Sequence, residues 1–267
     1  MFEITLKFLE AVAKNNSTEW LHTYRDLYQQ EKKRFSDFVG SLLIEFQKLN
    51  PDLEGQTPKD CIYRFNKDIR FSKDKKPYKE NFWANFCVGW KKAWAPCFYF
   101  HLQPGNKSFV TWWVYYPSQE NEDRVRIHII KNFDERAKLV TDKKMLKYFT
   151  IDEADHKYKT NSRILKVERK YWISKDVKQI FRSYLIQETD GNWKPLYNPY
   201  EPNRIFTWNE IMNFIAYNKD WTFTHSLSDK DVSSPKLYDE LLKAYKLINP
   251  IIRFLDDAYF KEEYKSK

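Results

Sequence analysis

The chain has 267 residues and a formal net charge of +9, and 42% of its residues are hydrophobic and 18% aromatic. A chain of this length and composition can bury a core, which excludes a disordered protein. It contains no run of about 18 apolar residues, and its first ten residues carry acids, so we expect no membrane span and an intracellular, soluble protein, cytoplasmic or nuclear.

The first 50 residues have the periodicity of helices. Apolar residues recur every three or four positions in residues 6–12 and again in 20–49. Ser17 or Thr18 can cap the second and longer helix, and Pro51 ends it. We predict an N-terminal helical hairpin with a buried inner face.

Between residues 61 and 116 the period changes to two, and Val, Phe, Tyr and Trp dominate. This pattern predicts a central, mainly antiparallel sheet, because short turns separate its strands. The "QPGNKS" stretch at 103–108 is a strong turn signal. The predicted strands are 61–71, 80–90, 97–103 and 109–116.

The remaining residues predict C-terminal helices. A helix follows Ser118, Asn132 opens another, and 150–206 is a long irregular insert. Within that insert we predict a strand near 164–167 and a helix from Ser174. Beyond it we predict a helix over 207–218 and a strand in "WTFTHSL". A helix should then run from Ser234 to about Leu247, with a break at Pro250 and a last helix to about Tyr264. The fold class is α+β, and the expected organisation is a single domain over 1–267.

Charge is concentrated in one part of the chain. Residues 64–92 hold nine Lys or Arg against three acids, which gives +6. On a strand over 61–71, Arg64, Asn66, Asp68 and Arg70 share one face, and aromatic residues alternate with them on the other. A concentrated basic segment attracts an anionic partner, although charge runs are often only a solvated face.

Two interpretations of this polar row stay open. Arg64 and Arg70 can offer bidentate donors to an anion, with Asp68 orienting one of them, or the three can form an internal network that fixes a hairpin. Residues after the next turn can fold back over the same spot. The candidate ligand-binding residues are Arg64, Asp68, Arg70, Lys75, Tyr78 and Lys79.

Other chemistry-bearing residues give weaker signals. His101 can be a general base or, more commonly, a hydrogen-bonded core histidine. The tryptophans of the sheet region can be stacking platforms or core residues; they are Trp83, Trp90, Trp94, Trp112 and Trp113. The spacing of the three cysteines and five histidines predicts no metal site, and the five glycines exclude the dinucleotide and P-loop motifs, so we expect no cofactor.

The run "RFNKDIRFSKDKKPYK" at 64–79 resembles the signature R-x-x-R-D-x-R-F followed by D-K-x-P-Y of the uncharacterised domain-of-unknown-function family 2461. The segments at 14–30, 98–105 and 223–237 resemble other parts of that family. Lys67 stands where the family usually has Arg. The resemblance implies an α+β fold and no established reaction.

Three functions fit these residues. The first is a protein that binds a phosphate-bearing ligand, with nucleic acid as one candidate, through residues 64–79. The second is an enzyme on a small anionic substrate, in which Asp68, Tyr78 or His101 moves a proton. The third is a non-catalytic assembly subunit with protein partners.

Overall fold

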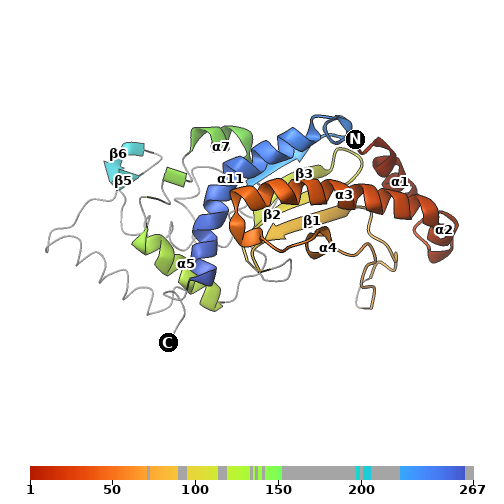
Figure 1. Cartoon of the computed structure of the whole chain (residues 1–267), viewed down its shortest axis with the longest axis horizontal. Coiled ribbons are helices and arrows are strands. Elements are labelled where there is room, and N and C mark those ends of the chain that lie inside the picture. The colour runs from red at the N-terminus through yellow and green to blue at the C-terminus, as the bar shows by residue number, and fades with distance from the viewer. Residues whose placement is uncertain are drawn as a thin grey trace. The chain divides into compact units, whose positions relative to one another are not determined.

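A computed structural model of the chain divides into two compact units. The first comprises Met1–Ala93, Cys97–Trp112 and Thr224–Asn249, and the second comprises Trp94–Pro96, Trp113–Phe223 and Pro250–Lys267. The structure describes residues 1–70, 73–89, 95–113, 119–132, 135, 138–139, 142–151, 197–198, 201–205 and 223–261 (Figure 1).

The N-terminal helices of the first unit are α1 (Glu3–Lys14), α2 (Thr18–Thr23), α3 (Arg25–Leu49) and α4 (Pro58–Cys61), with a 3-10 turn at Pro51–Leu53. Ser17 caps α2 as predicted, since its side chain accepts a hydrogen bond from the Trp20 amide. The predicted single helix from Ser17 to Leu49 is divided, because Tyr24 leaves helical geometry between α2 and α3. The helical hairpin itself is confirmed.

The sheet of the first unit has the order β1-β2-β3-β7. Its strands are β1 (Phe82–Cys87), β2 (Cys97–Leu102), β3 (Ser108–Trp113) and β7 (Phe223–Leu227). The antiparallel pair β1 and β2 runs from Phe82 opposite Leu102 to Cys87 opposite Cys97. β1 and β2 are shorter than the strands predicted at 80–90 and 97–103, and residues 114–116 of the strand predicted at 109–116 lie outside the described residues. The antiparallel sheet and the α+β class are confirmed.

The turn between β2 and β3 is the one that "QPGNKS" predicts. Gly105 and Asn106 both have positive φ angles, 81° and 59°. A Cβ on Gly105 would meet only Lys107 at 4.0 Å, so the backbone conformation rather than space favours glycine there.

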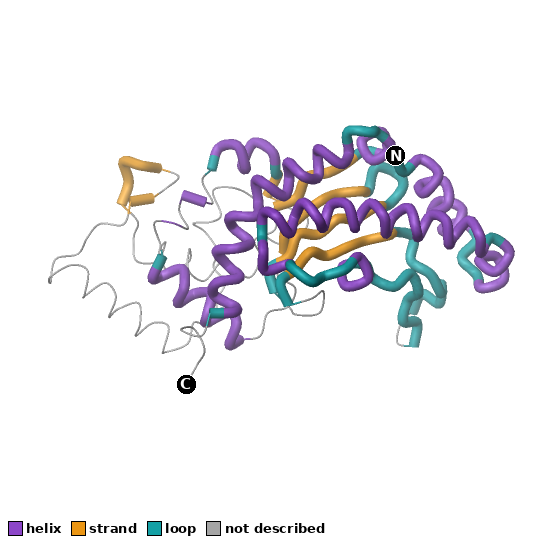
Figure 2. Tube along the Cα trace, in the orientation of Figure 1, coloured by secondary structure: helices purple, strands orange, loops and turns teal. Residues whose placement is uncertain are grey.

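Helices cover one face of this sheet, and Figure 2 shows α3 lying in front of the strands and running roughly along them. Phe35 of α3 lies 5.4 Å from Phe82 and 5.9 Å from Phe100, measured between ring centroids. Phe46 stacks on Tyr245 at 3.7 Å. α3 and the C-terminal helix that carries Tyr245, α11 (Leu237–Phe260), therefore contribute aromatic rings to one core.

Tyr245 belongs to α11 (Leu237–Phe260), which follows the short α10 (Asp229–Ser233). The helix begins at Leu237, and the Ser234 hydroxyl accepts a hydrogen bond from the Lys236 amide. The predicted break at Pro250 is wrong, because α11 continues through it to Phe260. Buried apolar residues on both sides of the proline hold the helix despite the missing N–H group.

In the second unit the structure describes α5 (Gln119–Lys131), α7 (Lys143–Tyr148), β4 (Thr150–Ile151) and the antiparallel pair β5 (Tyr197–Asn198) and β6 (Glu201–Ile205). The predicted elements at 164–167, from Ser174 and at 207–218 lie outside the described residues. The single domain over 1–267 with its insert at 150–206 stays a prediction. None of the described helices is both long enough and apolar enough to pass through a membrane.

Candidate functional site

Residues 64–79, called the basic segment below, form an irregular hairpin rather than half of a regular ladder. The predicted strand over 61–71 is wrong: Cys61 ends α4, and only Ile62 and Asn66 make single antiparallel bridges, to Ala84 and Tyr78. From Ile62 to Asn66 is four steps, whereas from Tyr78 to Ala84 is six. The two extra residues prevent a continuous register. Phe71 and Ser72 lie outside the described residues.

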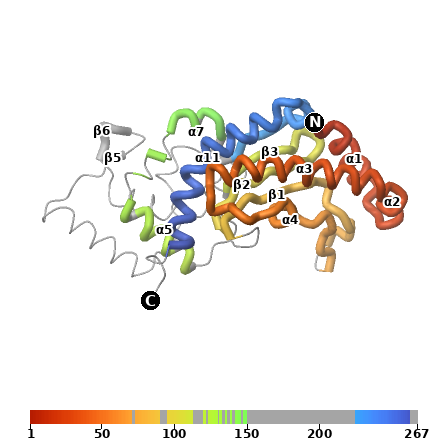
Figure 3. Tube along the Cα trace, viewed as in Figure 1, coloured from red at the N-terminus to blue at the C-terminus, as the bar shows by residue number. Residues whose placement is uncertain are grey.

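The predicted alternation of faces is nevertheless present. The side chains of Arg64 and Arg70 are 68% and 75% exposed. Phe65 is buried, and its ring lies 5.1 Å from Tyr28 and 5.4 Å from Phe82. The apolar face therefore anchors the segment to the core, and the polar row faces solvent. Figure 3 shows the segment extending beyond the start of β1.

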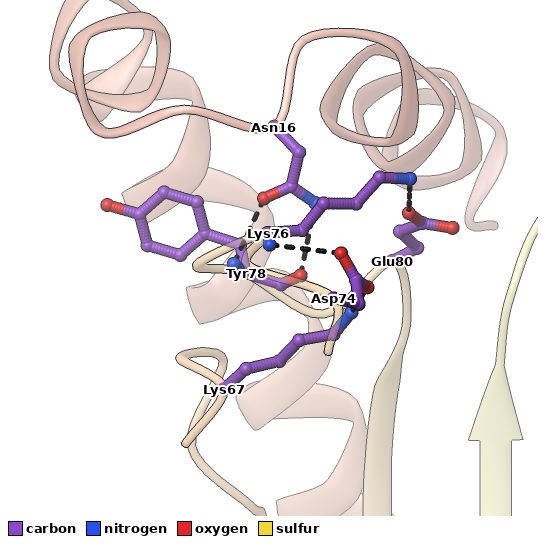
Figure 4. A network of polar contacts seen from close by, with 6 residues as sticks. All are labelled: Asn16, Lys67, Asp74, Lys76, Tyr78 and Glu80. Atoms are coloured by element: carbon purple, nitrogen blue, oxygen red, sulfur yellow. Dashed lines mark hydrogen bonds and ion pairs between the residues drawn. The ribbon is translucent and has the colours of Figure 1, made fainter. Parts of the chain in front are cut away.

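One asparagine fastens the end of the basic segment to the N-terminal helices (Figure 4). The Asn16 Oδ1 atom accepts a hydrogen bond from the Tyr78 amide at 3.0 Å, and its Nδ2 atom donates to the Tyr78 carbonyl at 3.1 Å. The Tyr78 ring is buried and stacks on Phe65 at 5.5 Å. Among the candidate ligand-binding residues, Tyr78 is thus the one held in the packed interior.

The two acids of the segment and the adjacent Glu80 each form an ion pair with a nearby cation. Asp68 forms a bidentate pair with Arg70, at 2.9 Å to Nε and 2.7 Å to Nη2. This pairing lowers the pKa of Asp68 to about 2. The other two pairs are Lys67 with Asp74 at 2.8 Å and Lys76 with Glu80 at 2.9 Å (Figure 4).

The remaining cations exceed the acids available to them. Within the described part of the chain, Lys73, Lys75 and Lys79 form no ion pair, and Arg64 lies 3.9 Å from an Asp68 that already binds Arg70. The Lys75 ammonium donates to the Ile69 carbonyl at 3.1 Å. This carbonyl bond keeps the lysine close to the segment without neutralising its charge.

Lys79 is the most perturbed of these cations. Its Nζ atom donates to the Arg64 carbonyl at 2.7 Å and lies 4.1 Å from the centre of the Trp83 ring. Half-burial, and then the nearby charge of Arg64, lower the pKa of Lys79 to about 8. The fold thus holds the Lys79 ammonium against the main chain of Arg64, and the Arg64 charge acts on it.

His101 lies on the face of the sheet that alternation directs away from α3. Its Nδ1 atom is 2.7 Å from the Tyr99 hydroxyl and its Nε2 atom 2.8 Å from Gln103 Oε1. The Asn81 Nδ2 atom also lies 3.3 Å from Nε2, and the tautomer of the ring decides which of its nitrogens donates. Burial lowers the pKa of His101. This is the hydrogen-bonded core histidine of the two interpretations.

The tryptophans divide between core and surface. Trp112 is buried, whereas Trp83 is half-buried beneath Lys79. Trp90 and Trp94 lie outside the described residues, as does the side chain of Trp113. Only Trp83 is therefore placed beside the basic segment by the described structure.

Two residues whose side chains bind the main chain of distant segments, Asn16 and Asp229, were not predicted from the sequence. The Asp229 carboxylate accepts hydrogen bonds from the amides of Gly105 and Asn106, both at 2.9 Å, and Asn106 Oδ1 accepts from the Asp229 amide. Each residue lies next to a serine that caps a helix, Ser17 or Ser228. That position, and their place within the family-like segments 14–30 and 223–237, are the sequence signals that point to them.

The described residues contain no group of three or more His, Cys, Asp or Glu side chains arranged to hold a metal ion. A family model described as conserved hypothetical protein (DUF2461) matches residues 4–190. No curated protein and no solved structure matches the chain. The matched range includes the basic segment and Asn16, whose side chain binds the Tyr78 main chain.

Proposed function

The chain belongs to the family of conserved hypothetical proteins DUF2461, and from the geometry of its basic segment we propose that it binds a phosphate-bearing anion there. The family supplies no ligand, so the proposal rests on the residues. Arg64 and Lys79 are its central contacts, and Arg70 and Lys75 extend the same surface.

The observation that carries the proposal is the contact of Lys79 with Arg64, whose carbonyl accepts from the ammonium at 2.7 Å and whose charge adds to burial in lowering the pKa of Lys79. Two like charges held near each other raise the free energy of the folded protein, and a bound anion would remove that cost. A phosphate oxygen offers the acceptors that guanidinium and ammonium groups require. Asp68 supports the same surface by fixing the guanidinium of Arg70.

Exposure favours a polyanion such as nucleic acid over a small substrate. The Arg64 and Arg70 side chains lie open to solvent, which suits contacts with a phosphodiester backbone. The proton-transfer groups that an enzyme would use here are each engaged: Asp68 by Arg70, Tyr78 in the core, and His101 at both ring nitrogens. We therefore do not favour catalysis at this segment.

Fluorescence anisotropy with labelled single-stranded DNA, duplex DNA and RNA at two salt concentrations tests the proposal. We expect binding that weakens as salt rises, because phosphate contacts release counterions. Arg64→Ala should reduce the steepness of that salt dependence by about one contact. Lys33→Ala is the matched control, since Lys33 is an exposed α3 cation paired with Asp37.

Two results would overturn the proposal. The first is a folded protein that binds none of the three nucleic acids at low salt and also fails to bind inorganic pyrophosphate. The second is an equal loss of affinity in Arg64→Ala and Lys33→Ala, which would assign any binding to overall charge. Binding of pyrophosphate without binding of nucleic acid would support the anion site and refute nucleic acid as its ligand.

A further inference from the structure

Two cysteines face each other at the end of the β1–β2 hairpin. Cys87 is the last residue of β1, Cys97 is the first of β2, and they are direct partners in the antiparallel register. Neither is in a disulfide. Direct partners in such a ladder have Cα atoms about 4.5–5.5 Å apart, which lies inside the range that a disulfide spans.

Their side chains lie on the same face of the sheet. The neighbouring Phe86 and Phe98 both pack against Phe46 of α3, at 4.8 and 5.5 Å. Since successive side chains alternate faces, Cys87 and Cys97 both lie on the face away from α3. The two sulfur atoms therefore need no sliding of one strand along the other to meet.

Access to the pair depends on opening the hairpin end. Cys87 and Cys97 are only 3% and 2% exposed, so an oxidant does not reach them in the closed ladder. They are, however, the terminal pair of the ladder, and terminal pairs open at less cost than interior ones. Gly89, with a φ angle of 74°, lies two residues after Cys87, in the turn that leaves β1.

We propose that Cys87 and Cys97 are an oxidant-sensitive dithiol that small disulfides, such as glutathione disulfide, convert to a cross-strand bond in the folded protein. One thiolate attacks glutathione disulfide, forms a mixed disulfide and releases one glutathione thiolate. The second cysteine then attacks the protein-side sulfur of that mixed disulfide and releases the second glutathione. The dithiol loses two protons and two electrons, and one glutathione disulfide becomes two thiols.

The third cysteine provides an internal control. Cys61 ends α4, is fully buried, and its thiol donates to Gln56 Oε1 at 3.8 Å. It lies outside β1 and β2, whose register sets Cys87 opposite Cys97, and the Gln56 side chain that accepts from its thiol also donates to the Cys87 carbonyl at 2.7 Å. Oxidation should therefore leave Cys61 as a thiol.

The test is oxidation of the full chain in glutathione buffers of increasing oxidised fraction, followed by acid quenching, alkylation under denaturing conditions and mass spectrometry. We expect loss of two alkylation sites together, a cross-linked peptide pair containing Cys87 and Cys97, and an unchanged circular dichroism spectrum. Cys61→Ser should behave like the parent. In the Cys87→Ser variant, oxidation should stop at a mixed disulfide between Cys97 and glutathione. If the serine variant unfolds, the Cys87→Ala variant is used in its place.

Retention of all three alkylation sites at every buffer ratio in the folded protein would overturn the inference. A cross-link that includes Cys61 would also overturn it, because the register then does not decide the pairing. So would oxidation that occurs only after the protein unfolds, as judged by the same spectrum.

Discussion

Replacing Asn16 by alanine should loosen the basic segment from the N-terminal helices. The change removes two hydrogen bonds, at 3.0 and 3.1 Å, and leaves the amide and carbonyl of the buried Tyr78 without these partners. At about 0.5–1.5 kcal/mol for each bond, we expect a loss of about 2 kcal/mol in the free energy of unfolding. The same loss corresponds to a roughly 30-fold faster exchange of the Tyr78 amide hydrogen.

Urea unfolding and amide hydrogen exchange measure the two quantities. Asn15→Ala is the matched control, since the Asn15 side chain donates only to the Ala11 carbonyl on its own helix and is exposed; it should change stability by less than about 0.5 kcal/mol. The reasoning fails if Asn16→Ala leaves the exchange of Tyr78 within a few-fold of the parent. It also fails if the two asparagine variants lose equal stability.

Two further predictions concern Asp229, which binds the turn between β2 and β3, and Lys79, whose pKa is lowered. Asp229→Ala removes the acceptor of the Gly105 and Asn106 amides, and we expect a loss of about 1–2 kcal/mol in urea unfolding, with faster exchange of those two amides; unchanged exchange would contradict it. For Lys79, the pKa in the folded protein is about 8 against an ordinary value of 10.5, so between these pH values the unfolded chain retains a proton that the folded chain has released. The free energy of unfolding should therefore rise with pH across that window, and Lys79→Met should lose this part of the rise; identical pH profiles for parent and variant would refute the assignment.

Local signals in the sequence were sufficient where the structure is decided locally. The Ser17 cap depends on residues within one turn, and the turn at Gly105 and Asn106 depends on two residues that tolerate positive φ. The alternation of polar and apolar side chains through the basic segment also follows from neighbouring residues alone.

The features that the sequence did not predict depend on contacts between distant parts of the chain. The two extra residues between Tyr78 and Ala84 that break the predicted strand are visible only once the pairing partners are known. Asn16 and Tyr78 are 62 residues apart, so their contact leaves no local pattern. Pro250 predicts a break on its own, but packing on both sides overrides the cost of the lost hydrogen bond.

The composition of the first unit has a consequence for how the protein is made. Thr224–Asn249 supplies most of β7 and the part of α11 from which Tyr245 stacks on Phe46, yet 110 residues, 114–223, are translated between β3 and that stretch. At about 5–20 residues per second, the ribosome needs roughly 5–20 s to reach Thr224, and longer to complete the helix that follows. During that interval the aromatic face of the nascent sheet is not yet packed against α11. An mRNA truncated after the Trp112 codon would therefore yield a chain that requires chaperones rather than a smaller folded protein.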